Sequence, residues 1–445
     1  MSAASDTAAP ERDALTAFAL GMHLGGAEAE ALAKKHGTPY YLYDLDAAFA
    51  HLDTLRANLP SVVDLFYCVK ANGNRKLLEA FRPRVAGLDL SSAGELDMAV
   101  LAGYDMSRAS IAGPGKTHED LERCVDGGVG IISLESVSEL GRLGKIARAK
   151  GKLQDVTLRI NPLQTPKEFA MRMGGGASQF GVPEEEAPAA IDAVLAEKGV
   201  SLIGIHIYAG TQCLEEHAIV ENMSGSLAIV ARLAEEKNLS SEQLRVINLG
   251  GGFGIPYFAG QTGVDTAALG RAIGARLEEW RAANPRFAKT RFIFELGRFL
   301  IGLYGVYVAR VTEIKETRGK RYVILDGGMH HCFPATGNFG SMVKKNYPIQ
   351  NLTRGGAAPL ESGDTDTRAP QELCGPLCTP MDSMARAVRI ATAEPGDLIG
   401  FFASGAYSLA ASPLLFLSHD TPIELLKLEG ALSVARERMP ATRFW

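Results

Sequence analysis

Short apolar runs alternate with longer amphipathic segments from about residue 39 to residue 298. Apolar runs of this length are typical of buried parallel strands. They are YYLYD, DLFYCVK, VAGLDLSS, SIAGPG, GIISL, VTLRINP, LIGIHIYAG, RVINLGGG and RFIFELG. Between them, apolar residues recur at helical spacing in LDAAFAHLDTLRANL, AGELDMAVLAGY, HEDLERCV, SVSELGRLGKIARA, AAIDAVLAEKG and LGRAIGARLEEWRAA.

This alternation predicts parallel strands covered by helices, and about 260 residues of it is the size of a (β/α)₈ barrel. An open doubly wound sheet is the alternative. After about residue 300, LYGVYVARVTEIKET and RGKRYVILDGG predict a β-hairpin, and LIGFFASGAYS is also strand-like. TRGGAAPLESGDTDTRAP is rich in Gly, Pro and Asp and predicts a loop. We therefore expect an α/β barrel followed by a mostly β domain.

Composition narrows the class of protein. The 445 residues, 46% of them hydrophobic, are enough for one large and one smaller domain. A formal net charge of −5 with both signs interspersed favours neither a nucleic-acid partner nor a membrane surface. No apolar segment approaches the roughly 20 residues that span a bilayer, and the N-terminal stretch is no signal peptide. The six cysteines include no Cys-x-x-Cys, so free thiols and a cytoplasmic location are expected.

The predicted barrel strands end in chemically reactive residues. In a barrel, the C-terminal ends of the strands form the face that carries active sites. These endings are Lys70 and Asn72, Asp89 and Ser91, Arg159 and Asn161, His206 and Tyr208, Gly250 to Gly252, and Glu295 and Arg298. So many endings of this kind on one rim predict an active site there.

Each ending has a structural and a functional interpretation. Lys70 is either a solvated charge or a lysine whose pKa is lowered in an apolar strand mouth, so that its amine forms imines. The glycines of INLGGGFG form either a tight turn or a nest of N–H groups for a phosphate. Glu295 and Arg298 are either a surface pair, or an acid for a heteroaromatic nitrogen beside a guanidinium for a phosphate. The residues alone leave these alternatives open.

Two glycine-rich runs fail to match nucleotide-binding motifs, and a histidine pair lacks further ligands. INLGGGFG has Ile255 where G-x-G-x-x-G requires its last glycine, and GPGKT has Ser110 where a Walker A loop requires its first. Neither a dinucleotide fold nor a nucleotide loop is therefore predicted. His330 and His331 would point to opposite faces of a strand, and no other ligands accompany them, so no metal site is expected.

A set of motifs in order spans residues 40 to 416. They are YCVKAN, GLDLSSAGEL, LRINP, GIHIYAGTQ, LGGGFG, ELGR, GPLCTPMD and GAYSLAAS. With them the chain resembles the fold-type III decarboxylases that use pyridoxal 5′-phosphate (PLP), an alanine-racemase-like group that includes diaminopimelate, ornithine and arginine decarboxylases. The resemblance implies a PLP-binding barrel over residues 46–304. It also implies a β domain from residues 1–45 plus 305–445, which takes the N-terminal strand YYLYD.

The resemblance also implies roles for single residues. Lys70 matches the lysine that carries PLP as a Schiff base, and Glu295 the acid that keeps the pyridine nitrogen protonated. Cys378 matches the cysteine that reaches the other subunit's active site in a head-to-tail homodimer and protonates Cα. The other cofactor-contact positions, including those that hold the phosphate, match Asp89, Arg159, Gly251, Gly252, Gly297, Arg298 and Tyr407.

One cofactor contact stays open between two residues. In the diaminopimelate and ornithine enzymes a histidine stacks on the PLP ring. Aligning Gly210 and Thr211 puts Tyr208 at that place, with His206 two residues earlier on the same strand face. Either Tyr208 or His206 stacks on the ring.

The chain departs from diaminopimelate decarboxylases where they bind the distal end of the substrate. Their cysteine is followed by a Glu for the distal amine, whereas Cys378 is followed by Thr379, in a motif that closes with Asp382. Their Arg for the distal carboxylate precedes a proline, and here Phe333 takes that place. Losing both charged contacts predicts a different distal end, with Thr379, Asp382 and Phe333 as candidate substrate contacts.

The run DGGMHH…GNFG…NYP with GPLCTPMD resembles the branch that decarboxylates modified or conjugated amino acids in siderophore and antibiotic pathways. Such substrates include citrate-linked diaminopropionate and carrier-protein-bound glutamate. The competing hypotheses are diaminopimelate decarboxylation, amino-acid racemisation on the same cofactor, and a non-catalytic regulator of the same fold. A dehydrogenase has no supporting motif.

Overall fold

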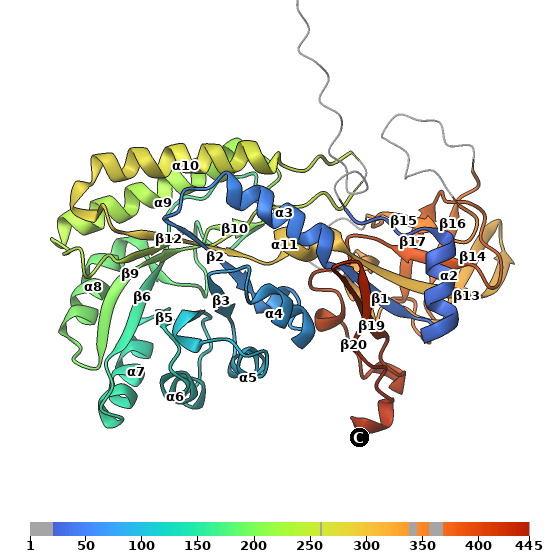
Figure 1. Cartoon of the computed structure of the whole chain (residues 1–445), viewed down its shortest axis with the longest axis horizontal. Helices are drawn as coiled ribbons and strands as arrows, with labels where there is room; N and C mark the ends of the chain where they lie inside the picture. Colours follow the sequence, from blue (N-terminus) through green and yellow to red (C-terminus); the bar gives the residue numbers. More distant parts are fainter. Residues whose placement is uncertain (1–20, 259, 338–344, 356–367, 445) are drawn as a thin grey trace, which may run out of the picture.

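The computed structural model describes residues 21–258, 260–337, 345–355 and 368–444. Its larger part is a closed barrel of eight parallel strands, because β12 pairs with β2 and β5 pairs with β6 (Figure 1). The strands are β2 (Val63–Cys68), β3 (Gly87–Leu90), β4 (Ala109–Ile111), β5 (Ile131–Leu134), β6 (Gln154–Asn161), β9 (Val200–Ile207), β11 (Val246–Asn248) and β12 (Arg291–Leu296). The predicted barrel is confirmed, and the open doubly wound sheet is wrong.

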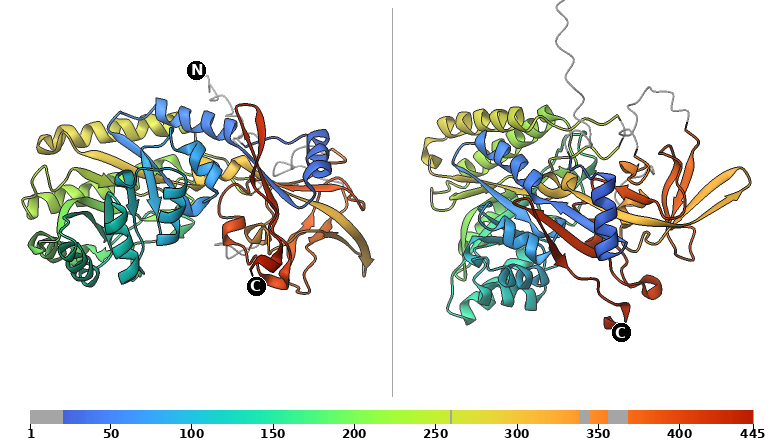
Figure 2. Two further views of the ribbon diagram at one scale, coloured as in Figure 1. Left: turned by 60° about the horizontal axis from the view of Figure 1, so that its bottom comes forward. Right: turned by 45° about the vertical axis from the view of Figure 1, so that its right-hand side comes forward.

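Helices cover the outside of the barrel (Figure 2). They are α3 (Leu45–Ala57), α4 (Arg75–Phe81), α5 (Ala93–Leu101), α6 (His118–Gly127), α7 (Val137–Ala149), α8 (Ala187–Ala196), α9 (Glu216–Glu236) and α10 (Thr266–Ala283), with the short α11 (Arg298–Ile301) after the last strand. Side-chain caps fix several starts, such as Asn74 before α4 and the capping box of Thr117 and Asp120 at α6. Helix α9 lies outside the predicted segments; it has no side-chain N-cap and carries Gly225 in its interior.

A second, nine-stranded sheet forms the β domain. Its strands are β1 (Tyr40–Asp44), β13 (Gly305–Thr317), β14 (Lys320–Leu325), β15 (Ile349–Asn351), β16 (Gln371–Cys374), β17 (Ser383–Val388), β18 (Leu398–Phe401), β19 (Ile423–Leu428) and β20 (Ala431–Arg436), and α2 (Gly26–His36) precedes them. As predicted, β13 and β14 pair as an antiparallel hairpin. Most of the predicted loop TRGGAAPLESGDTDTRAP lies outside the described residues.

The N-terminal strand belongs to this second sheet, as the resemblance implied. Strand β1 pairs antiparallel with β13 and parallel with β19, and all five of its residues are buried (Figure 1). The hydroxyl of Tyr43 donates a hydrogen bond to Glu424 of β19 at 2.7 Å. Because β1 leads directly into α3 of the barrel, it fixes one part against the other. No helix among the described residues is long and apolar enough to cross a membrane.

The core beneath α4 gives a test of this packing. Phe81 is fully buried, and its ring lies 5.0 Å from that of Phe49 and 4.5 Å from that of Tyr67. We predict that Phe81→Ala lowers the free energy of unfolding by roughly 3–5 kcal/mol, because the removed ring leaves a cavity. Leu153→Ala, at a side chain that is 65% exposed, is the control and should stay within about 0.5 kcal/mol. Urea denaturation measures both; equal losses would contradict the packing.

Candidate active site

The predicted reactive residues meet at the C-terminal face of the barrel around a cavity of about 360 Å³. Those that line it are Lys70, Arg159, His206, Tyr208, Glu295, Arg298 and Tyr407. The remaining lining residues are Ser91, Ala112, Gly113, Pro114, Met171, Met173, Phe180 and Thr211. A small neighbouring cavity of about 30 Å³ adds Gly252 and Gly297. Residues at the ends of most barrel strands therefore meet at this cavity, as their positions in the sequence predicted.

Lys70 is paired with Asp89 at the mouth of the barrel. Its Nζ donates a hydrogen bond to Oδ2 of Asp89 at 2.8 Å, and Asp89 is fully buried. Burial by itself would lower the pKa of Lys70, but the negative charges of Asp89 and Glu295 raise it well above its usual value. Of the two alternatives for Lys70, the one in which apolar surroundings lower the pKa of its amine is therefore wrong. The buried carboxylate outweighs the apolar surroundings.

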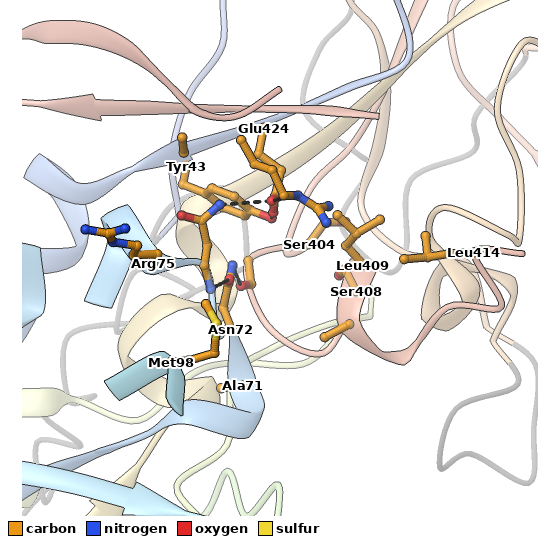
Figure 3. A pocket seen from close by; sticks show the side chains of 16 residues that line it. Tyr43, Ala71, Asn72, Arg75, Met98, Ser404, Ser408, Leu409, Leu414 and Glu424 are labelled. Carbon is orange, nitrogen blue, oxygen red and sulfur yellow. Dashed lines mark hydrogen bonds and ion pairs between the residues drawn. The ribbon is translucent and has the colours of Figure 1, made fainter. Parts of the chain in front are cut away.

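The β domain holds the turn that carries Lys70. The backbone N–H of Tyr407 donates to the carbonyl of Ala71 at 2.7 Å, and Nδ2 of Asn72 donates to the carbonyl of Gly405 at 3.1 Å. Behind this turn lies a second cavity of about 410 Å³, where Asn74 donates to Glu424 at 2.9 Å (Figure 3). Lys70 and Tyr407 are thus placed by the same set of contacts between the two parts.

Glu295 and His206 face each other inside the barrel. Glu295 accepts a hydrogen bond from Nδ2 of Asn248 at 2.5 Å, and its other oxygen lies 3.7 Å from Nε2 of His206. Nδ1 of His206 lies 2.8 Å from Oγ of Ser133. Burial, and next the charge of Arg159, lower the pKa of His206 to about 3, so the imidazole is neutral. His206 and Tyr208 both line the cavity, and which of them stacks on the ring stays a prediction.

Arg159 and Arg298 are both anchored beside aromatic rings. Nη1 of Arg159 donates to Glu135 at 2.6 Å, and its guanidinium lies 4.9 Å from the ring centre of Phe180. Nη1 of Arg298 donates to the hydroxyl of Tyr257 at 2.7 Å, and its guanidinium lies 4.6 Å from the ring centre of Tyr407. Both cations are therefore oriented before any ligand binds.

The glycines of LGGGFG are required by packing. A Cβ on Gly251 would overlap the carbonyl oxygen of Glu295. Gly252 has a φ of +95°, and a Cβ there would overlap the carbonyl oxygen of Gly210. This accounts for the glycines as a tight turn. Their part in holding a phosphate stays a prediction, as does that of Gly297.

The residues that the resemblance placed at a shared site do not line this chain's cavity. Cys378 is exposed in the β domain, and Thr379 and Phe333 are half-buried there. Asp382 is buried, and its carboxylate accepts from the backbone N–H groups of Met329 at 2.7 Å and Leu377 at 2.9 Å. One oxygen of Asp382 thus bonds within the cysteine loop and the other joins that loop to Met329, and its predicted contact with substrate stays a prediction.

The histidine pair also differs from expectation. His330 and His331 do not lie on a strand, so they do not point to opposite faces; their ring centres are 3.7 Å apart. The ring of His419 lies 4.7 Å from that of His330. Within the described residues, no group of three or more His, Cys, Asp or Glu side chains is arranged to hold a metal ion.

Three supporting residues escaped the sequence argument. Ser133, Glu135 and Asn248 contact His206, Arg159 and Glu295 respectively. Ser133 and Asn248 lie within β5 and β11, and Glu135 follows β5 directly. All three lie at or directly after the end of a strand, in GIISLE and INLGGG, so the strand-end pattern could have identified them.

Comparison with known proteins identifies the family. The model for the pyridoxal binding domain of pyridoxal-dependent decarboxylases matches residues 46–302. The chain belongs to this family. It is 38% identical to the L-glutamyl-[BtrI acyl-carrier protein] decarboxylase of Niallia circulans, over 94% of this chain and 95% of that protein. It is 34% identical to the 2-[(L-alanin-3-ylcarbamoyl)methyl]-2-hydroxybutanedioate decarboxylase of Staphylococcus aureus, over 88% of this chain and 94% of that protein.

Solved structures share the fold. Diaminopimelate decarboxylase from Helicobacter pylori complexed with L-lysine matches with a TM-score of 0.80 and 24% identity, over 94% of this chain and 98% of that one. The protein is thus a PLP-dependent amino-acid decarboxylase, as the motifs indicated.

The residues at the cavity fit this cofactor. Asp89, His206 and Arg298 each have a buried polar atom without a hydrogen-bond partner in the protein, namely Oδ1, Nε2 and Nε. Buried polar atoms are rarely left unpaired, so these atoms indicate a polar ligand. With the amine of Lys70 beside them, they suit an aromatic aldehyde that carries a phosphate.

The Lys70–Asp89 pair yields a test. Only the neutral amine of Lys70 attaches covalently to PLP, and Asp89 raises the pKa of that amine. We predict that Asp89→Asn lowers this pKa, so that attachment to Lys70 begins at lower pH than in the unmodified enzyme. Absorbance during PLP addition to apoenzyme across a pH series measures the midpoint. Asp97→Asn, at an exposed carboxylate on α5, is the matched control. An unchanged or higher midpoint in Asp89→Asn would contradict the assigned effect.

Proposed function

We propose that this decarboxylase acts on an amino acid whose distal end is bulky and uncharged, such as an L-glutamyl group carried on an acyl carrier protein. A thioester at the distal carboxyl would remove that group's charge and add a long arm. The α-amino and α-carboxyl groups remain free for the reaction. The observation that carries the proposal is the distribution of charge in the cavity.

The charged residues that line the cavity are ion-paired, or hydrogen-bonded to a neutral group and assigned below to the cofactor. Lys70 pairs with Asp89, Arg159 with Glu135, Arg298 with the hydroxyl of Tyr257, and Glu295 with Asn248. His206 is neutral, since its pKa is lowered to about 3. The other described lining residues are uncharged, and they include Met171, Met173 and Phe180. A distal ammonium or carboxylate would be desolvated here without compensation.

The relatives support the same class of substrate. The two named above are described as acting on a glutamyl group of a carrier protein and on a conjugated alanine derivative. The diaminopimelate decarboxylase of Neisseria meningitidis is less similar, at 30% identity over 84% of this chain. Thr379 and Phe333 stand where the diaminopimelate enzymes have charged contacts, so these residues favour a conjugated substrate.

We assign the residues as follows. Lys70 would hold the cofactor, and its amine would be released when the substrate amine takes its place. Glu295 keeps a proton at the pyridine nitrogen, while Arg298 and Tyr407 bind the phosphate. PLP supplies an electron sink for the electrons that departing CO₂ leaves behind. Cys378 of a second copy delivers the proton to Cα, which requires a homodimer with shared active sites. The six cysteines, all free in the structure, support a cytoplasmic location.

The substrate proposal predicts a clear order of rates. Release of CO₂ should be at least about 100-fold faster, by kcat/KM, from an L-glutamyl carrier-protein thioester than from free L-glutamate or meso-diaminopimelate, because the cavity offers no partner for their distal charges. Manometric or coupled detection of CO₂ measures all three. Efficient turnover of free meso-diaminopimelate would overturn the proposal, while inactivity on all three would leave only other neutral conjugates within it.

The shared site predicts complementation. Lys70→Ala and Cys378→Ala enzymes should each be impaired, because each dimer lacks one essential group at both sites. Mixed dimers regain one complete site of two, so random reassociation should restore about a quarter of the normal activity. Each variant reassociated with itself is the control. If native mass spectrometry shows mixed dimers and no activity returns, Cys378 does not act across the interface.

A further inference from the structure

Strand β5 differs from the other strands of the barrel. Each of the others contributes a residue, from the strand or the loop after it, to the walls of the two cavities at the barrel mouth. Among the described residues, β5 and the loop after it contribute none. The side chains at its end, Ser133 and Glu135, instead contact residues on neighbouring strands. We propose that Glu135, supported by Ser133, is a positioning residue that sets Arg159 and His206 for the cofactor and substrate.

One carboxylate of Glu135 joins three parts of the cavity wall. Its Oε1 accepts from Nη1 of Arg159 at 2.6 Å and from the backbone N–H of Gly113 at 2.9 Å. Its Oε2 accepts from the backbone N–H of Gly181 at 2.7 Å. Gly113 lines the cavity from the loop after β4, and Phe180, next to Gly181, lines it from the loop after β6. Glu135 therefore fixes a cation and two loops at once without lining the cavity itself.

The carboxylate belongs to a closed set of buried charges. The backbone N–H of Glu135 donates to Glu139 at 2.9 Å, and Glu139 pairs with Lys116 at 2.9 Å. The side chains of Lys116, Glu139, Arg159 and Glu135 are 2%, 4%, 6% and 3% exposed, and their charges cancel. Removing any one of these four charges leaves another buried charge unpaired, which is strongly destabilising. The four side chains therefore hold one another in place.

Ser133 extends this support to the histidine. Its Oγ lies 2.8 Å from Nδ1 of His206, and its carbonyl accepts from Nζ of Lys116 at 2.9 Å. The hydroxyl thus fixes the imidazole plane and leaves Nε2 as the unpaired atom near Glu295. Because Lys116 holds the backbone of Ser133, the charge set that orients Arg159 also orients His206.

The test is a double-mutant cycle that does not depend on the identity of the substrate. PLP affinity is measured by absorbance titration of apoenzyme for the unmodified enzyme, Glu135→Gln, Arg159→Met and the double variant. Glu135→Gln keeps the volume of the side chain, and misplaced groups of this kind weaken function by about 10- to 100-fold. We expect such a loss in PLP affinity. The loss in the double variant should be clearly smaller than the sum of the two single losses in free energy, because Glu135 acts in large part through Arg159.

Controls separate positioning from folding. Glu197→Gln, at a half-buried carboxylate that pairs with Arg148, removes an ion pair between α7 and the end of α8 that lines neither cavity, and should leave PLP affinity unchanged. Ser133→Ala should weaken PLP affinity while the Tm stays near that of the unmodified enzyme. If Glu135→Gln fails to fold, Glu135→Asp replaces it, since it keeps the charge and shortens the reach. Losses that add in the double variant, or a folded Glu135 variant whose PLP affinity stays within twofold of normal, overturn the proposal. Because PLP binding is the readout, failure of the substrate proposal leaves this result intact.

Discussion

The arrangement of the active site depends on the ion pair between Lys70 and Asp89. Asp89 is fully buried, so its charge is tolerated only because the lysine amine lies 2.8 Å away. The same pair keeps the amine protonated and aimed into the barrel mouth until a ligand replaces it. The two arginines at this rim are also held, Arg159 by the carboxylate of Glu135 and Arg298 by the neutral hydroxyl of Tyr257. The site is thus a set of preassembled contacts that leaves a few buried polar atoms without a partner in the protein.

The barrel cannot assemble this site alone. Tyr407 comes from the β domain, where it has a φ of +58° and donates its backbone N–H to Ala71 beside Lys70. A non-glycine residue in the left-handed region is strained, and the surrounding contacts must hold it there. Strand β1 fixes the β domain against the barrel, because it is part of the second sheet and also leads into the first barrel helix. The two parts therefore form one functional unit.

Sequence patterns predicted the barrel and most of the cavity wall because both follow from local rules. Apolar runs mark buried strands, and reactive residues at their ends share one face. The pKa of Lys70 could not be predicted this way, because Asp89 lies 19 residues away and their distance depends on how β2 and β3 pair. The backbone contacts of Asp382 could not be predicted either, because a carboxylate near a cysteine looks alike in sequence whether it binds substrate or accepts from backbone N–H groups. A strand would place the rings of His330 and His331 on opposite faces. These residues lie instead in a turn that brings the two rings together.

The charge pairs also bear on specificity. A site that recognises a charged distal group must offer an opposite charge that is unpaired before binding, and that charge must be stabilised in the free enzyme. Here the cavity charges are satisfied within the protein, and the nearby wall is formed by Met171, Met173 and Phe180. Burying an apolar arm of the substrate against this wall is favourable. A free carboxylate would lose its hydration there without a compensating contact. On the proposed function, the contacts that hold the cavity side chains in place therefore also disfavour free amino acids with a charged distal end.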